Sequence, residues 1–400
     1  MSNRREPERG PHRVVAPATA GELFALIRDG GATTRPELGR VTGLSRTAVA
    51  ARVEALLGTG LVLEADDAGS GVGRPPGRLR FDASAGVVLA AAVGRSRTQV
   101  AVCDLAGAVL SEQDVQQEVG LGPDELMPRV VGALSEALGR AGRRAADVRG
   151  IGVSIPGTVD PRRRCSQHSP IMAAWNGVPL ERYFANLGPV PVFLENDTNV
   201  IALAERHGHL LHYRDAVIVK ASTGFGAGIV AGGILQHGAL GAAGEIGHVK
   251  YAPAKGIPCR CGEVGCLEAV AGGWALVRDL RDGGVDVTHV RDVVDLALGG
   301  DTAARRVIRR SGRHFGEVLA AAVTLLNPAA IVVGGDMAPA YDLFVAGLRE
   351  TLYRDASAIA TRELQILAAT HGPQSGVRGC AELALDDVLS PAAIDRALVG

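Results

Sequence analysis

The 400-residue sequence predicts an α/β protein in which a winged helix-turn-helix domain precedes a two-lobed α/β body with a structural metal site. Three observations support this fold class. Short helical and strand patterns fill residues 20–81, strand and helix patterns alternate after residue 82, and three cysteines cluster near one histidine between residues 248 and 266. The length also exceeds that of one ordinary domain, so two or three compact units are expected.

The charge distribution predicts where nucleic acid would bind. The whole chain is 47% apolar and 21% charged with a formal net charge of −1, which gives no overall attraction to nucleic acid or membrane. Residues 1–80, however, contain twelve arginines, no lysine and nine acidic residues, a net charge of +3. Nucleic-acid binding is therefore expected at the N-terminus.

The N-terminal tail and the apolar segments indicate the expected cellular location of the protein. Residues 1–13 are rich in Arg, Glu and Pro, so we expect a disordered tail rather than a signal peptide. No apolar run approaches the roughly 20 residues of a membrane span. The sequence therefore predicts a cytoplasmic protein without membrane partners.

Three short helices are expected in the N-terminal domain, residues 14–82. The first begins near Ala20 and ends at Gly30-Gly31. Thr34 and Glu37 have capping-box spacing at the start of the second helix, which stops at Gly43. Ser45 caps the third helix, residues 46–57. The turn over residues 42–45 joins the last two helices into a helix-turn-helix.

A two-stranded wing is predicted after these helices. Residues 60–64 and 77–81 have strand patterns, and residues 66–73 form the tip. A recognition helix contacts bases through its N-terminal residues, while basic residues elsewhere meet phosphate or the minor groove. The candidate DNA contacts are Ser45, Arg46, Thr47, Ala50, Arg52 and the wing residue Arg74. A winged helix used for protein contacts is the alternative.

The body is expected to contain two related halves. Strand patterns at residues 87–93, 98–104 and 108–113 precede a helix at 125–141 and a strand at 151–155. A similar pair of strands around a glycine-bearing turn recurs at residues 216–231. This repetition predicts two α/β halves with a cleft between them. A last apolar helix is expected over residues 376–389.

The cluster formed by His248, Cys259, Cys261 and Cys266 predicts a metal site. Three thiolates and one imidazole fill a closed tetrahedral zinc site and leave no position for a catalytic water, so we interpret the zinc as structural. Gly262 and Gly265 would allow the tight turns of such a knuckle. A redox or disulfide loop is the alternative.

Two acidic residues flank this cluster. Glu245 precedes His248 by three residues, and Glu268 follows Cys266 by two. A zinc-bound imidazole keeps a second ring nitrogen whose N–H needs an oxygen partner. We therefore predict a pocket for a sugar or other polyol, with the carboxylates accepting from hydroxyl groups and the imidazole donating. Solvated loop acids are the alternative.

These two motifs, Gly-Glu-Ile-Gly-His at 244–248 and Cys-x-Cys-Gly-x-x-Gly-Cys-x-Glu at 259–268, resemble the zinc and sugar motif of the ROK family. This family groups bacterial sugar kinases with sugar-responsive transcriptional repressors. The resemblance covers nearly the whole chain, including the wing tip Gly73-Arg74-Pro75. It implies an actin- and hexokinase-like (ribonuclease H-like) body. The first lobe would be residues 83–200 plus 376–400, and the second, with the zinc knuckle, residues 201–375.

The loop after the first body strand discriminates between the two branches of the family. Kinases that this chain resembles carry Asp-x-Gly-x-Thr there, and the aspartate serves magnesium. This chain has Ala92-Val93-Gly94-Arg95-Ser96, and alanine cannot hold the ion that phosphoryl transfer needs. A second phosphate loop is suggested by Asn327-Pro328 and Gly334-Gly335, although Asp336 stands where another glycine is common. The resemblance thus predicts no catalytic residues and no kinase activity.

The sugar side, in contrast, matches the family. The resemblance assigns ligand contacts to Gly157 in the Pro-Gly loop, to Asn176 after Trp175, and to Asn196 and Asp197 after a strand. The matching aspartate is the general base in kinases; here Asp197 is expected only to accept a hydrogen bond. Helix capping is the alternative for Asn196 and Asp197. The complete predicted sugar-binding set is Gly157, Asn176, Asn196, Asp197, Glu245, His248 and Glu268.

Taken with the winged domain, the resemblance implies a repressor that a sugar or sugar derivative releases from a pseudo-palindromic double-stranded operator. Its expected cofactor is structural Zn²⁺, and its expected assembly is a homodimer or homotetramer. An active sugar kinase with an appended DNA-binding domain is one alternative. An activator or ligand-free regulator, and a ligand that acts as co-repressor, also stay open.

Overall fold

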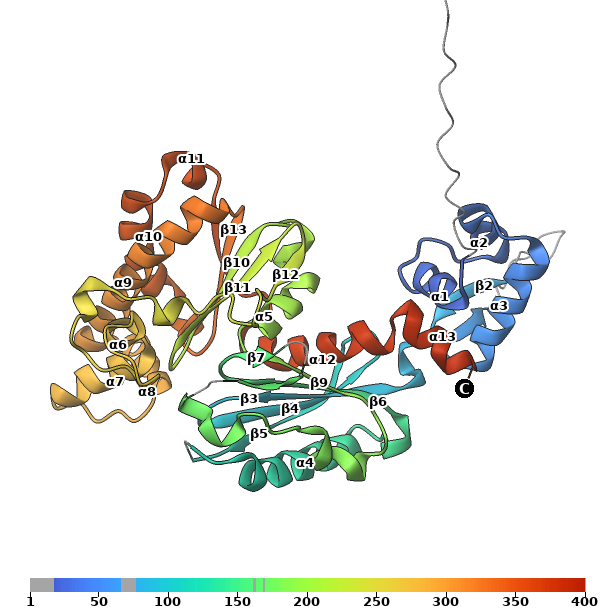
Figure 1. Ribbon diagram of the computed structural model, residues 1–400, viewed down its shortest axis with the longest axis horizontal. Coiled ribbons are helices and arrows are strands. Elements are labelled where there is room, and N and C mark those ends of the chain that lie inside the picture. Colours follow the sequence, from blue (N-terminus) through green and yellow to red (C-terminus); the bar gives the residue numbers. More distant parts are fainter. Residues whose placement is uncertain (1–17, 66–76, 119, 161–162, 168–169, 400) are drawn as a thin grey trace, which may run out of the picture. The chain divides into compact units, whose positions relative to one another are not determined.

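The computed structural model describes residues 18–65, 77–118, 120–160, 163–167 and 170–399 (Figure 1). It divides into two compact units. Unit 1 contains residues 1–85 and 386–400, and unit 2 contains residues 86–385. The predicted tail, residues 1–13, and the wing residue Arg74 lie outside the described residues.

Unit 1 contains the predicted helix-turn-helix and the two strands of the predicted wing, whose tip, residues 66–73, lies outside the described residues. Its helices are α1 (Ala20–Arg28), α2 (Arg35–Thr42) and α3 (Arg46–Gly58), and strands β1 (Val62–Ala65) and β2 (Arg78–Phe81) pair antiparallel. Thr34 and Glu37 form the capping box of α2, Gly43 ends that helix in the left-handed region, and the Ser45 hydroxyl accepts from the Ala48 N–H. The core joins all these elements through Leu23, Phe24, Leu38, Val49, Val53, Leu56, Val62 and Leu79.

A C-terminal helix completes unit 1. Helix α13 (Pro391–Val399) buries Ile394, and the Asp395 carboxylate accepts a 2.8 Å hydrogen bond from the Gly21 N–H of α1. The sequence predicts a last helix that ends at Leu389, and the family resemblance places residues 376–400 in the first lobe. The structure differs in that residues 386–400 group with the N-terminal domain. The cause is this packing of α13 on α1, which joins residues 374 positions apart.

Unit 2 is built on two five-stranded sheets of the same topology. The first has the order β5-β4-β3-β6-β9, and the second has the order β12-β11-β10-β13-β14. In each sheet the first three strands along the chain pair antiparallel, the fourth pairs parallel with the first, and the fifth pairs parallel with the fourth. The repeated strand pattern in the sequence therefore corresponds to two halves of equal sheet topology.

The strands of the first sheet are β3 (Val87–Val93), β4 (Arg97–Asp104), β5 (Val109–Gln116), β6 (Val148–Ile155) and β9 (Val192–Asn196), with a small β7 (Val159–Asp160) and β8 (Cys165–Ser166) pair beside it. Those of the second are β10 (Ala216–Ala221), β11 (Phe225–Ala231), β12 (Ile234–Gln236), β13 (Ala330–Gly334) and β14 (Gln365–Ala368). The helices of unit 2 are α4 (Pro123–Arg140), α5 (Asn199–Ala204), α6 (Glu268–Ala271), α7 (Gly273–Asp282), α8 (Val290–Leu298), α9 (Thr302–Leu326), α10 (Tyr341–Asp355), α11 (Ala358–Thr361) and α12 (Ser375–Val388).

Helices cover the sheets and enclose the cores. Helix α4 packs its apolar side on the first sheet, as Figure 1 shows, and α12 approaches that sheet through a 3.6 Å contact from Cys380 Sγ to the Ala91 carbonyl. The largest core lies between the second sheet and helices α9 and α10, where Phe225, Phe315 and Phe344 meet. Among the described residues, no helix has both the length and the apolar character that a membrane span requires.

Candidate functional site

A cavity of about 470 Å³ lies in unit 2 and is lined by residues of both sheets and of the loops that follow their strands. This volume is within the range of small-molecule sites. The cavity brings together six of the seven predicted sugar contacts, namely Gly157, Asn196, Asp197, Glu245, His248 and Glu268. Asn176 does not line it. Its Oδ1 instead lies 3.3 Å from the Ser166 hydroxyl, which donates to it.

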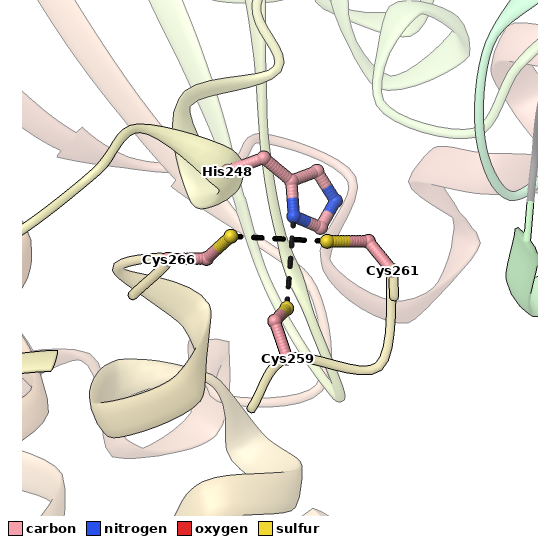
Figure 2. Close-up of side chains that lie close together, drawn as sticks. All are labelled: His248, Cys259, Cys261 and Cys266. Atoms are coloured by element: carbon pink, nitrogen blue, oxygen red, sulfur yellow. Dashed lines mark hydrogen bonds between the residues drawn. The ribbon is translucent and has the colours of Figure 1, made fainter. Parts of the chain in front are cut away.

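The four predicted metal ligands converge on one point, as Figure 2 shows. One ligand atom from each of His248, Cys259, Cys261 and Cys266 lies within 4.8 Å of the others. The Cys261 and Cys266 sulfurs are 3.7 Å apart, and His248 Nδ1 is 3.8 Å from Cys259 Sγ. A tetrahedron with metal–sulfur bonds near 2.3 Å has edges of about 3.8 Å. The cluster could therefore hold a tetrahedral metal ion.

The loop folds around this point as a knuckle. The Cys259 N–H donates to the Glu263 carbonyl at 2.7 Å, and the Gly265 N–H donates to the Ile257 carbonyl at 2.9 Å. Gly262 and Gly265 have φ values of 89° and 82°, which residues with a Cβ rarely adopt. Burial raises the pKa of the Cys259 thiol to about 12, so an ion must displace a proton to bind there.

His248 joins the metal cluster to the cavity. Its Nδ1 faces the sulfurs, and its Nε2 lies 3.8 Å from a carboxylate oxygen of Glu245. Glu245 also accepts a 3.3 Å hydrogen bond from the Thr158 hydroxyl. Burial is the main cause that raises the pKa of Glu245, and Asp197 and Glu268 add to it. The imidazole and this carboxylate thus present one donor and one acceptor to a ligand.

Glu268 accepts two hydrogen bonds within the protein that the sequence did not indicate. Its side chain is buried, one oxygen accepts from the Phe225 N–H at 3.1 Å, and the other accepts from Trp274 Nε1 at 3.0 Å. The carboxylate therefore fixes the glycine-bearing turn to helix α7. Each carboxylate oxygen keeps a second lone pair, so contact with a ligand hydroxyl is still open to it.

Asn196 and Asp197 have different roles at the end of β9. Asn196 Oδ1 accepts from the N–H groups of Thr198 and Asn199 at 2.8 and 3.1 Å, which is the helix-capping alternative. Asp197, in contrast, forms an ion pair with Lys220 on β10. Sequence reasoning missed Lys220. The available signal was a lysine that interrupts the otherwise apolar strand 216–221 just before a glycine-bearing turn.

Basic residues gather near the two loops that resemble phosphate loops. Ala92 lines the cavity and offers no carboxylate. Asp336 accepts from the Ser222 hydroxyl and lies 3.8 Å from Arg97 and 3.7 Å from Arg291. Although burial raises the pKa of Asp336, the Ser222 hydrogen bond and the nearby positive charges lower it below its usual value. This carboxylate is therefore held ionised among basic side chains.

Five of the six predicted DNA-contacting residues belong to the described part of unit 1. Ser45, Arg46, Thr47 and Ala50 are exposed at the start of α3. Arg52 is half-buried and donates to the Ala48 carbonyl at 3.1 Å, which ties its guanidinium to its own helix. The exposed group fits the part of a recognition helix that enters a major groove.

A family model described as ROK family matches residues 88–387. The xylose repressor of Caldicellulosiruptor bescii is 24% identical over 395 residues, which cover 95% of this chain and 98% of the relative.

One solved structure matches nearly the whole chain, and another matches about three quarters of it. A ROK family transcriptional regulator, described as a homologue of the Mlc protein of Escherichia coli, superimposes with a TM-score of 0.76 and 24% identity, covering 95% of this chain and 98% of its own. A glucokinase from Streptomyces griseus, solved with glucose and AMPPNP, has a TM-score of 0.66 and 29% identity. The match covers 99% of the glucokinase but only 75% of this chain. The regulator thus shares the fold of nearly the full chain.

Proposed function

The chain belongs to the ROK family, and from this premise we propose that it is a sugar-responsive, DNA-binding transcriptional repressor that a sugar or sugar derivative releases from its operator. One observation carries the proposal. This chain matches a xylose repressor over 95% of its own length, and it combines an exposed helix-turn-helix with a cavity that charged residues help to line. The glucokinase matches over nearly its own full length yet leaves a quarter of this chain unmatched.

In the DNA-binding step, helix α3 enters the major groove. Ser45, Arg46, Thr47 and Ala50 face the bases there, and Arg52 and Arg74 meet phosphate or the minor groove. Two winged domains in a homodimer or dimer of dimers read a pseudo-palindromic operator. The exposure of the four residues at the start of α3 supports this assignment.

The effector binds in the cavity of unit 2. Gly157, Asn196, Asp197, Glu245, His248 and Glu268 contact its hydroxyl groups. The residues His248, Cys259, Cys261 and Cys266 would hold the zinc, and its role would be structural, because four protein ligands would leave no position for a catalytic water. With Nδ1 on the side of the sulfurs, His248 has Nε2 free to donate to the sugar. Repression is released when the effector binds one arrangement of the two halves more tightly than the other.

The kinase alternative is supported by Asp197 and by the glucokinase likeness. Two features oppose it. Ala92 cannot serve magnesium, and Lys220 pairs with the carboxylate that would have to accept a proton. We therefore propose that the chain is not an enzyme. A coupled assay for ADP release over a panel of sugars tests this directly, and turnover above background would revive the kinase.

A thermal-shift screen tests the proposed function. The zinc-loaded full chain is heated with glucose, xylose, N-acetylglucosamine, mannose and inositol and with their phosphorylated derivatives, each with and without ATP and magnesium. We expect one compound to raise the melting temperature without nucleotide, because a ligand that binds only the folded state stabilises it. The same compound should then release the chain from DNA selected from a random library. A compound that stabilises the protein but leaves DNA binding unchanged would contradict the repressor mechanism.

A further inference from the structure

Trp274, near the start of helix α7, contacts both the metal cluster and the wall of the cavity without lining the cavity itself. Its half-buried side chain packs against the apolar cluster formed by Cys259, Cys266 and Ala269. Its backbone N–H donates at 3.0 Å to the carbonyl of Thr223, which does line the cavity. One side chain therefore connects the fold of the metal cluster to the cavity wall.

The indole N–H of Trp274 holds a carboxylate of the cavity. Trp274 Nε1 donates at 3.0 Å to one oxygen of Glu268, and the other oxygen accepts from the Phe225 N–H. Two glycines leave space for this carboxylate, because a Cβ on Gly224 would lie 2.4 Å from its second oxygen and one on Gly247 would lie 3.3 Å from it. The orientation of the carboxylate thus depends on one backbone donor and one side-chain donor.

Two guanidinium groups lie over the indole ring of Trp274. Arg260 Cζ is 4.8 Å and Arg278 Cζ is 5.4 Å from the ring centroid, which are cation–π distances. Arg278 belongs to α7, as Trp274 does, whereas Arg260 lies between the metal ligands Cys259 and Cys261. A change in the fold of the metal cluster therefore reaches the indole through Arg260 as well as through the cysteine contacts.

We propose that Trp274 is a positioning residue for the effector. Its indole N–H holds the Glu268 carboxylate in the orientation that accepts a sugar hydroxyl, and its contacts with the metal cluster make that orientation depend on the fold of the cluster. This role rests on the function proposed above, which supplies the sugar. Without the indole N–H, Glu268 would keep its bond from Phe225 but could rotate, and fixing it again would weaken ligand binding.

Isothermal titration of the zinc-loaded full chain with glucose, xylose, N-acetylglucosamine, mannose and inositol measures the role of the indole N–H. Trp274→Phe keeps an aromatic ring and removes the N–H. Its Kd for the sugar that binds wild type should rise by about tenfold, the lower end of what a hydrogen bond to a charged group contributes.

Trp175→Phe is the matched control for this titration. It also removes an indole N–H, which donates at 2.9 Å to the Leu121 carbonyl, and Trp175 does not line the cavity. Its Kd for the same sugar should equal that of wild type. Zinc content, measured by atomic emission, should be the same in both variants and in wild type.

Nuclear magnetic resonance of the chain labelled with [15N]tryptophan reads the indole directly. The chain contains two tryptophans, so it gives two indole N–H signals, and Trp175→Phe assigns both of them. The Trp274 signal should move when a chelator removes zinc, return when zinc is restored, and move again when the sugar binds. The Trp175 signal should stay in place throughout, which would show that the rest of the fold is unchanged.

The outcomes separate this inference from the proposed function. A tryptophan that only fills space beside the metal cluster would respond to zinc but not to the sugar, and that result would overturn the inference. An unchanged sugar Kd in zinc-loaded Trp274→Phe would overturn it as well, and either result would leave the proposed function intact. If Trp274→Phe loses zinc or does not fold, the sugar response of the Trp274 signal in wild type decides. If no sugar of the panel binds wild type, the proposed function fails and the inference fails with it.

Discussion

The packing of α13 on α1 is tested by one added methyl group. A Cβ built on Gly21 would lie 2.0 Å from the Pro391 carbonyl oxygen, and real Cβ contacts do not fall below 3.0 Å. Gly21→Ala must therefore move α13 by roughly 1 Å or more. The movement breaks the 2.8 Å hydrogen bond from the Gly21 N–H to Asp395 and loosens the burial of Ile394.

The magnitude follows from these contacts. A hydrogen bond to a charged group contributes about 1.5–3 kcal/mol. The higher helix propensity of alanine stabilises α1 by up to about 1 kcal/mol and offsets part of this loss. Partial loss of the Ile394 contact adds to the cost, since complete truncation of a buried isoleucine costs about 2–5 kcal/mol. The docking of α13 should therefore weaken by about 1–3 kcal/mol, which corresponds to roughly a 5- to 150-fold loss of amide protection.

Hydrogen–deuterium exchange with mass spectrometry, read on peptides covering α1 and residues 389–399, measures this change within the full chain. Gly58→Ala is the matched control. Gly58 ends α3, no atom lies within 4 Å of its built Cβ, and its alanine variant should stabilise unit 1 by about 0.5–1 kcal/mol. If Gly21→Ala protected the α13 amides as well as Gly58→Ala does, the packing described for α13 would be refuted.

Three further predictions concern DNA, metal and pH. Arg46→Ala should weaken operator binding by about 1–3 kcal/mol, or roughly 5- to 150-fold, in fluorescence anisotropy at fixed salt, whereas Arg129→Ala on α4 should not. Cys261→Ser should lose the single zinc measured by atomic emission and the thermal shift with effector, whereas Cys165→Ser should keep both; zinc retained in Cys261→Ser would contradict the ligand set. The hydrogen bond between His237 and the Glu195 carboxylate raises the pKa of His237. Protonated His237 therefore stabilises the fold fully below the ordinary pKa of 6.5, and this stabilisation is lost as pH rises through the raised pKa. Melting curves from roughly pH 5.5 to 9 should therefore show an additional decline that His237→Gln lacks; equal pH profiles would exclude this role.

Local patterns in the sequence predicted local structure well. The capping box of Thr34 and Glu37 and the Ser45 cap are formed by residues three positions apart, and the structure contains all three contacts. The metal cluster was predictable for a related reason. Three cysteines within eight residues must lie close together, and the glycines that permit the knuckle are visible between them.

Contacts between distant segments of the chain were harder to predict from the sequence. Helix α13 begins at Pro391 and was not expected as a separate element, because its partner Gly21 lies near the other end of the chain. Lys220 was missed since a single lysine in an apolar strand does not identify its carboxylate partner. Asn176 was expected in the cavity through resemblance alone, but an isolated β-bridge places it beside Ser166 of β8.

Unit 1 combines the two ends of the chain, residues 1–85 and 386–400, and this affects the order in which it can fold during synthesis. Helices α1 to α3 leave the ribosome first, but α13 emerges only after all 300 residues of unit 2, residues 86–385, have been made. A chain released early would carry a helix-turn-helix whose α1 lacks its partner and a surface that exposes apolar residues normally covered by Ile394. We therefore expect the complete DNA-binding domain to form only after the whole of unit 2 has been made, and truncated chains to compete weakly for the operator.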